Sequence, residues 1–254
     1  MTIFHILAQV GNLSIDEAVL SSPILFTGTP FANGMVTFSF DDGWLSQKDN
    51  AIPLLNSKGI KGTFGIITNE MLNADTQLPE NQLYMNTAET LAVQTAGHEI
   101  ASHTKSHANL PTLDASGMVD EIAGSRNILL GTGFAPVSTI VFPYGEHSPA
   151  VDQASQDAGY TAGRDDAYGY NTKDTAKFAL YVQNVGSGTT LSQVQHWVDV
   201  AYDNKVWLIL MLHQVDNSGM DYAVDPATFS NIVDYVSAKG IETVTIGEGV
   251  TRMN

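Results

Sequence analysis

Two adjacent carboxylates, Asp41 and Asp42, follow an apolar stretch over residues 35–40 that is typical of a buried strand. Charge is unfavourable there, because a buried carboxylate loses its hydration and two neighbours repel unless a proton or a cation relieves them. Further along the chain, His103 and His107 lie four positions apart. One Asp and two His gathered around a divalent metal ion would relieve the repulsion, and the second Asp would be free to act as a base.

The composition narrows the classes of partner. The chain has 254 residues, of which 43% are hydrophobic, so it can bury a sizeable core in one large domain or two small ones. Its formal net charge of −16 argues against nucleic acid and against anionic membrane surfaces, because both would be repelled. There is no cysteine, so metal ligands must be His, Asp, Glu or backbone oxygen. We expect neither a signal peptide nor a transmembrane span.

From residue 35 onward, strand-like and helix-like segments alternate. Strands are expected at 35–40, 62–67, 98–102, 137–142, 159–162, 206–212 and 241–246, and helices at 45–58, 115–130, 190–203 and 226–239. Pro53 predicts a kink or an interruption in the first helix. The unbroken apolar run at 206–212 favours a parallel sheet covered on both faces, as in an α/β barrel or a doubly wound sheet. Residues 1–34 are expected to be an N-terminal extension, and 35–254 a single domain.

Polar residues follow five of the expected strands. They are Asp41 and Asp42 after the first, His103 and His107 after the third, Pro143 and Tyr144 after the fourth, Arg164 after the fifth and His213 after the sixth. The carboxyl ends of strands in an α/β barrel meet at one face, where such folds build their sites. We therefore expect these side chains to converge there.

Four motifs resemble those of the polysaccharide deacetylase (NodB-homology) family, carbohydrate esterase family 4. They are Phe38-Ser39-Phe40-Asp41-Asp42-Gly43, His103-Thr104-Lys105-Ser106-His107, Val141-Phe142-Pro143-Tyr144 and Leu210-Met211-Leu212-His213. The resemblance spans roughly residues 35–250. It implies an α/β fold, a distorted (β/α) barrel with about seven strands.

The resemblance also implies an activity: metal-dependent hydrolytic removal of acetyl groups from an acetylated polysaccharide. The expected substrates contain N-acetylglucosamine, as in chitin, peptidoglycan or poly-N-acetylglucosamine. The alternatives are an O-acetyl (acetylxylan) esterase and a catalytically inactive carbohydrate-binding barrel. Zinc is the expected metal, although Co, Ni, Mn or Fe would also suit an N/O site. An extracellular or cell-surface location is expected from the family, and the oligomeric state is left open.

Roles carried over by position assign Asp42, His103 and His107 as metal ligands, Asp41 as the base and His213 as the acid. The backbone N–H of Tyr144 is a candidate oxyanion donor, and substrate contacts are expected from Trp44, Pro143, Tyr144 and Leu212.

The chain departs from the family pattern in two places. The family often has an Arg two positions before the Pro of the third motif, where it pairs with the base, but Val141 stands there. Arg164 is the expected replacement. The Asp that supports the acid His in the family has no clear counterpart; Asp166, Asp174 and Asn184 are the candidates.

Overall fold

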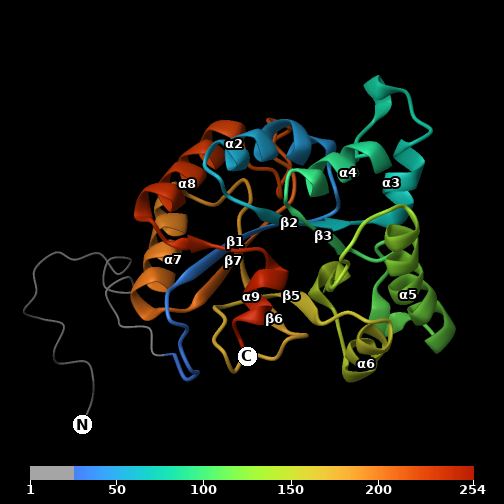
Figure 1. Ribbon diagram of the computed structural model, residues 1–254. Coiled ribbons are helices and arrows are strands. Elements are labelled where there is room, and N and C mark those ends of the chain that lie inside the picture. Colours follow the sequence, from blue (N-terminus) through green and yellow to red (C-terminus); the bar gives the residue numbers. More distant parts are fainter. Residues whose placement is uncertain (1–25) are drawn as a thin grey trace, which may run out of the picture.

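The computed structural model describes residues 26–254, whose strands form a closed parallel barrel surrounded by helices (Figure 1). Hydrogen-bonded neighbours run in the order β2-β3-β4-β5-β6-β7-β1, and β1 pairs again with β2, which closes the ring. The short strand β8 adds to β1 at Met35 and Val36. The expected distorted (β/α) barrel is confirmed. Within residues 26–254, no helix combines the length and apolar character needed to span a membrane.

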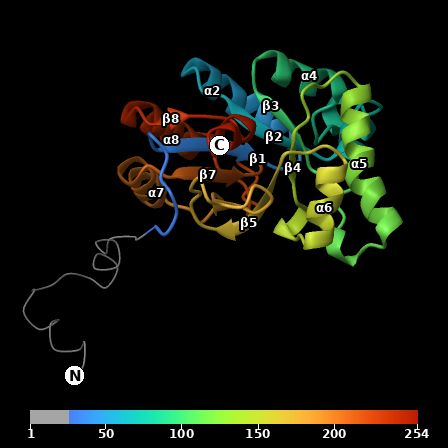
Figure 2. The same cartoon turned by 60° about the horizontal axis from the view of Figure 1, so that its bottom comes forward.

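The strands are β1 (Met35–Phe40), β2 (Gly62–Ile66), β3 (Glu99–Ser102), β4 (Thr139–Val141), β5 (Ala162–Tyr168), β6 (Leu180–Asn184), β7 (Trp207–Leu212) and β8 (Glu242–Thr243). The α-helices are α2 (Ile52–Ser57), α3 (Thr68–Ala74), α4 (Thr87–Thr95), α5 (Ala115–Gly131), α6 (Pro149–Asp157), α7 (Leu191–Asn204), α8 (Pro226–Lys239) and α9 (Ile246–Thr251). In Figure 2, α5 and α6 lie on one side of the barrel and α7 and α8 on the other.

The barrel strands differ from the sequence expectation at two positions. The fifth strand, expected at 159–162, instead begins at Ala162 and runs to Tyr168. The sixth, Leu180–Asn184, was not expected, whereas the apolar run at 241–246 contributes only the short β8. Polar side chains explain the first difference, because Arg164 and the carboxylates that follow it interrupt the apolar pattern of β5. β6 does carry the apolar residues Leu180 and Val182, and its short length of five residues makes it easy to miss.

The expected helices at 115–130, 190–203 and 226–239 are confirmed as α5, α7 and α8. The carboxylate of Asp225 caps α8 by accepting from the N–H groups of Ala227 and Thr228, and Gly240 ends the helix at φ 65°. The segment 45–58 is interrupted as expected: a π-helical turn, η2 (Gln47–Ala51), runs into α2, which holds Pro53 in its first turn.

Alternation along the strands separates an outer core from the barrel interior. Phe38 and Phe40 of β1 belong to the cluster that packs against the helices, whereas Met35 belongs to a second cluster with Trp207 and Ile209 of β7. Successive side chains on a strand point to opposite faces. Asp41 therefore continues the inward-facing series of β1 beyond the end of that strand.

Helix α9 covers the amino-terminal end of the barrel. The carboxylate of Glu99 at the start of β3 accepts hydrogen bonds from Thr63 Oγ1 (2.8 Å), Thr139 Oγ1 (2.6 Å) and the N–H of Gly247 (2.9 Å). Trp207 lies against the same helix so closely that a Cβ at Gly249 would be 2.5 Å from its ring. These contacts close the amino-terminal end, and the opposite end is left for the site.

The expected N-terminal extension falls largely on residues 1–25, outside the described part of the chain. Its last part is visible. The N–H of Phe31 donates to the carbonyl of Lys205 (2.8 Å), and the Phe31 side chain is buried in the interior cluster. The domain boundaries, 1–34 and 35–254, stay a prediction.

Phe229 of α8 is fully buried and meets the rings of Phe38 and Phe40 edge to face, at 6.0 and 5.9 Å. Phe229→Ala is expected to lower the free energy of unfolding by about 3–5 kcal/mol, because it leaves a cavity between α8 and β1. Tyr202→Ala, which truncates an aromatic ring that is 47% exposed on α7, should cost about 1 kcal/mol or less. Denaturant titration of both variants tests this, and equal losses would contradict it.

Candidate active site

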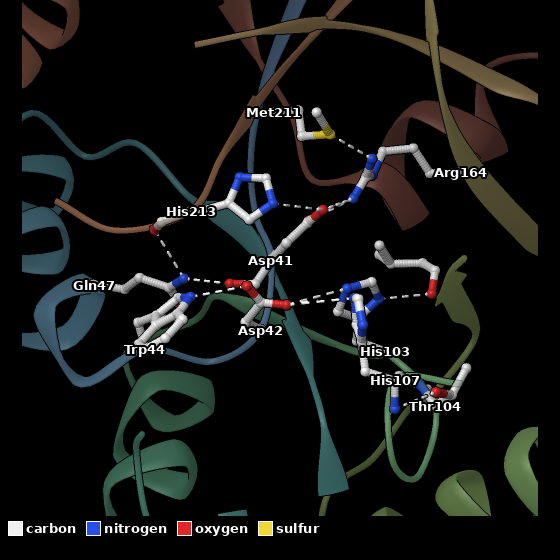
Figure 3. A network of polar contacts seen from close by, with 12 residues as sticks. Asp41, Asp42, Trp44, Gln47, His103, Thr104, His107, Arg164, Met211 and His213 are labelled. Atoms are coloured by element: carbon white, nitrogen blue, oxygen red, sulfur yellow. Dashed lines mark hydrogen bonds and ion pairs between the residues drawn. The ribbon is translucent and has the colours of Figure 1, made fainter. Parts of the chain in front are cut away.

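A cavity of about 270 Å³ opens at the carboxyl ends of the barrel strands. It brings together most of the residues singled out from the sequence, namely Asp41, Asp42, His103, His107, Tyr144, Arg164 and His213. Figure 3 shows the side chains of all these residues except Tyr144 converging on one another. A larger hollow of about 710 Å³ lies beside α9, lined in part by His98, Glu99 and Lys177, so volume alone would not locate this chemistry.

Asp42, His103 and His107 form a cluster with the geometry of a metal site. Each offers one ligand atom, and the three atoms lie within 4.8 Å of one another. Asp42 Oδ1 is 3.4 Å from His103 Nε2 and 3.7 Å from His107 Nε2. Donors about 2.0–2.2 Å from a shared tetrahedral ion lie roughly 3.5 Å apart, so these separations fit a single cation.

The hydrogen bond of His103 leaves one ring nitrogen available as a metal ligand. Its Nδ1 lies 2.8 Å from the carbonyl oxygen of Val141, so Nδ1–H donates there and the lone pair of Nε2 is left facing Asp42. The ring is 1% exposed, and Nε2 is buried without a hydrogen-bond partner among the described residues. A buried polar atom in this state is costly unless something binds it, which the cation would do.

The electrostatics of the cluster favour a positive charge between the carboxylate and the rings. Burial raises the pKa of Asp42, but His103, His213 and the Trp44 N–H outweigh it and hold the pKa well below its usual range. Burial lowers the pKa of His103, yet Asp42 and Asp41 more than offset it and raise that pKa. Burial and neighbouring His103 lower the pKa of His107. A bound divalent cation would supply the charge that this arrangement favours.

Local backbone conformation aims Asp42 at the histidines. Asp42 follows β1 with φ 73°, a left-handed conformation that turns its side chain back over the cavity. Its Oδ2 accepts a hydrogen bond from Trp44 Nε1 (2.8 Å), so Oδ1 is the oxygen presented to the two rings. In Figure 3 the indole of Trp44 and the His pair lie on opposite sides of Asp42.

Arg164 occupies the place expected for a partner of Asp41. Its Nη2 donates to both carboxylate oxygens of Asp41, and both residues are buried. Strand register explains how it reaches them. Arg164 on β5 pairs with Val141 on β4, the position at which the resemblance leads one to expect an Arg, so the guanidinium enters the same level of the barrel from the neighbouring strand.

His213 lies across the cavity from the metal cluster, with Nε2 3.9 Å from Asp41 Oδ2. Gln47, which the sequence analysis missed, fixes the two residues relative to each other. Its side-chain amide donates to the backbone carbonyls of both Asp41 and His213, and so joins the ends of β1 and β7. Gln47 belongs to none of the sequence motifs. Its side chain reaches both carbonyls because the chain turns tightly after β1 into η2.

Only some of the residues expected to contact the substrate line the cavity. Tyr144 lines it, 60% exposed, on a left-handed turn with φ 59° and with its ring edge-on to His107. Pro143 is buried and lies outside the cavity lining. Leu212 must be corrected: its side chain is fully buried in the outer core, because it faces away from the inward-facing His213 that follows it.

The three residues expected to support His213 differ in whether they line the cavity. Asp174 accepts from the N–H of Thr29 and lies outside the cavity lining, whereas Asp166 and Asn184 line the cavity. Asn184 Oδ1 and His213 Nδ1 are both buried without hydrogen-bond partners among the described residues. Of the three, Asn184 is therefore the one with a buried and unused acceptor in the cavity that His213 also lines.

Glu121 of α5 is a second residue that the sequence analysis missed. Its carboxylate accepts from the N–H of Lys105 (2.9 Å), the N–H of Ser106 (2.8 Å) and the hydroxyl of Ser106 (2.5 Å). The loop it holds is strained, with His107 at φ 61°, and such conformations persist only where surrounding contacts impose them. The burial of Glu121, at 9% exposure, is visible only in the structure, and no sequence pattern marks the residue.

Glu121→Gln is expected to weaken metal binding about 10- to 100-fold, because an amide cannot accept all three hydrogen bonds that hold the histidine loop. Asp120→Asn is the matched control. Asp120 precedes Glu121 and contacts the same loop only through the side chain of Lys105, among the described residues, and its side chain is 63% exposed. Its loss should change affinity by less than about threefold. Isothermal titration of zinc into the metal-free proteins measures both, and equal effects would contradict the role of Glu121.

Comparison with known proteins identifies the family of this chain. The sequence profile of the family described as "Polysaccharide deacetylase" matches residues 29–163. A "Probable peptidoglycan-N-acetylglucosamine deacetylase" of Arthroderma benhamiae is 27% identical over 224 residues, which is 85% of this chain and 44% of that protein. The chain thus spans less than half the length of that curated relative.

Solved structures share the fold. The Bc1960 peptidoglycan N-acetylglucosamine deacetylase superposes with a TM-score of 0.61 at 19% identity, over 86% of this chain and 88% of that one. BA3943, "a CE4 family pseudoenzyme" from Bacillus anthracis, has a TM-score of 0.61 at 14% identity, over 89% and 69% of the two chains. With the profile covering more than half of the sequence, the chain belongs to the polysaccharide deacetylase family.

Proposed function

We propose that this protein hydrolyses acetyl groups on a polysaccharide containing N-acetylglucosamine, with a divalent metal ion, most suitably zinc, held by Asp42, His103 and His107. The observation that carries the proposal is the division of labour between the adjacent carboxylates. Asp42 faces two imidazoles at metal-ligand separations, while Asp41 is held apart from them by Arg164. A ligand set beside a free base is what hydrolysis of an amide or ester requires.

When bound, the cation supplies a Lewis acid for the acetyl carbonyl and acidifies water. The residues of the chain supply the rest. Asp41 accepts the proton of the attacking water, and the backbone N–H of Tyr144 donates to the developing oxyanion. One such donor is worth about 3 kcal/mol. His213 Nε2 then protonates the departing nitrogen, a step that matters most for amides because an unprotonated amide nitrogen leaves poorly.

Arg164 serves this chemistry by balancing Asp41. The carboxylate is 4% exposed, and burying a carboxylate without a counter-charge costs several kcal/mol. The guanidinium engages both oxygens, which balances the negative charge of Asp41 and fixes the orientation of its carboxylate in the cavity.

A catalytically inactive carbohydrate-binding barrel is the second candidate. One observation favours it: Val141 stands where the family often carries the Arg that pairs with the base. The ion pair between Asp41 and Arg164 argues against an inactive barrel, because Arg164 on β5 supplies the positive charge that Val141 on β4 lacks. An O-acetyl esterase, as on acetylxylan, would use the same machinery. Because such polymers lie outside the cytoplasm, we also propose an extracellular or cell-surface location.

Acetate release from chitin oligomers, peptidoglycan and acetylxylan, with and without chelator, tests the proposal. We expect the largest release from N-acetylglucosamine polymers and its loss on metal removal. Asp41→Asn should lower kcat about 10²- to 10⁴-fold while zinc affinity stays within about threefold, because Asp41 acts as base rather than ligand. Release confined to acetylxylan would favour the esterase. Oligosaccharide binding without release by the metal-loaded protein would favour the inactive barrel.

The place of Arg164 can be tested by moving the charge back to β4. Arg164→Val should reduce acetate release at least about 100-fold, since it leaves Asp41 buried without its partner. The double variant Val141→Arg/Arg164→Val should recover about tenfold over the single variant, because positions 141 and 164 are paired across the sheet. Near-UV circular dichroism and zinc titration verify folding. A folded, metal-binding double variant without recovery would contradict this role.

A further inference from the structure

His147 lies next to the site but has no role in the mechanism proposed above. It belongs to the loop between a short 3₁₀ turn, η5 (Pro143–Gly145), and α6. Its ring stacks on that of Phe142 with centroids 5.1 Å apart and planes 7° apart, and Phe142 lines the site cavity. The side chain is 24% exposed, so most of the ring is enclosed. A polar ring held in this way can support residues that take part in the reaction.

Two carboxylates from different elements face opposite nitrogens of the His147 ring. Nδ1 lies 2.8 Å from Asp152 Oδ1 of α6, so Nδ1–H donates to that carboxylate. Nε2 lies 3.7 Å from Asp165 Oδ2 of β5, which is an ion-pair separation. A ring protonated at both nitrogens places a positive charge between the two carboxylates and links α6 to β5.

Asp165 depends on such a partner because its carboxylate is buried, with 6% of the residue exposed. Burial raises the pKa of Asp165, while the Ala167 N–H, His147 and Arg164 act in the opposite direction. Arg164 is already paired with Asp41. Among the described residues, His147 is therefore the basic side chain left to balance Asp165, and a buried carboxylate without a counter-charge is costly.

The backbone of Asp165 in turn orients the guanidinium of Arg164. Arg164 Nη1 donates to the Asp165 carbonyl (2.8 Å), and Nη2 donates to both oxygens of Asp41, as Figure 3 shows for the second contact. Sheet pairing is irregular here, because the register between β5 and β6 shifts between Arg164 and Tyr168. Where the ladder of backbone hydrogen bonds is disrupted, other contacts must fix the chain. The contact between Asp165 and His147 supplies one.

We propose that His147 is a positioning residue: by linking Asp152 to Asp165, it fixes the carbonyl that aims the Arg164 guanidinium at Asp41. The inference rests on the proposed function and deepens it, because Asp41 is the proposed base. His147, Asp152 and Asp165 lie outside the lining of the site cavity. Loss of the link should therefore slow the chemical step and leave the binding of zinc and substrate nearly unchanged.

His147→Phe tests this, because it keeps an aromatic ring beside Phe142 and removes both nitrogen contacts. We expect kcat for acetate release to fall about 3- to 30-fold, with KM and zinc affinity within about twofold, since a misplaced group slows chemistry more than binding. In the Arg164→Val background the same change should lower kcat less than about twofold, because it acts through the guanidinium. His196→Phe, on α7 and outside the cavity lining, is the control and should leave kcat unchanged.

Side-chain ¹⁵N NMR of the metal-free protein separates this inference from the proposed function. The chain has three arginines, Arg126, Arg164 and Arg252, so their guanidinium signals can be assigned by substitution. A guanidinium held by a carboxylate and a carbonyl rotates slowly and gives separate Nη signals. Those of Arg164 should merge or broaden in His147→Phe. They should do the same in Asp165→Asn, which keeps the shape of the side chain but removes its charge.

Near-UV circular dichroism verifies that each variant is folded. If no acetylated glycan releases acetate but the Arg164 signals change in both variants, the proposed function fails and the positioning role stands. The role is overturned if both variants keep the native Arg164 signals. It is also overturned if His147→Phe lowers kcat by the same factor with and without the Arg164→Val change.

Discussion

Two neighbouring carboxylates at the end of one strand repel each other, and the rest of the site is arranged around relieving that repulsion. Asp41 and Asp42 are relieved from different directions. The guanidinium of Arg164 grips Asp41 from inside the barrel, while His103 and His107 face Asp42 from the rim. Because Asp41 is paired with Arg164 and Asp42 is left facing two imidazoles, the two carboxylates can differ in role, one suited to hold a cation and the other free to move a proton.

The barrel makes this separation possible through strand alternation and one backbone reversal. Asp41 points inward as the next member of the interior series of β1, and Asp42 turns over the rim because its φ is 73°. Hydrogen bonds from neighbouring segments then hold these side chains in position. Gln47 joins the ends of β1 and β7, and Glu121 holds the histidine loop from α5.

The loops around this centre shape what can reach it. Trp44 donates its N–H to Asp42 and also lines a neighbouring cavity of about 390 Å³ that shares Asp42 and His213 with the site cavity. The segment after β7 supplies His213 to the site cavity and Met220 to the neighbouring one.

The sequence by itself determined the alternating α/β architecture, the strands that carry Asp41, His103 and His213, and the convergence of their side chains, because apolar runs and end-of-strand polar residues are local patterns. The expectation failed at β5, where Arg164 and its acidic neighbours interrupt the apolar pattern, and at the short β6. Only the tertiary structure decided that Arg164 reaches Asp41, that Leu212 faces away from the cavity and that Glu121 supports the loop. Each of these depends on strand register or helix packing between residues distant in sequence, which local patterns do not encode.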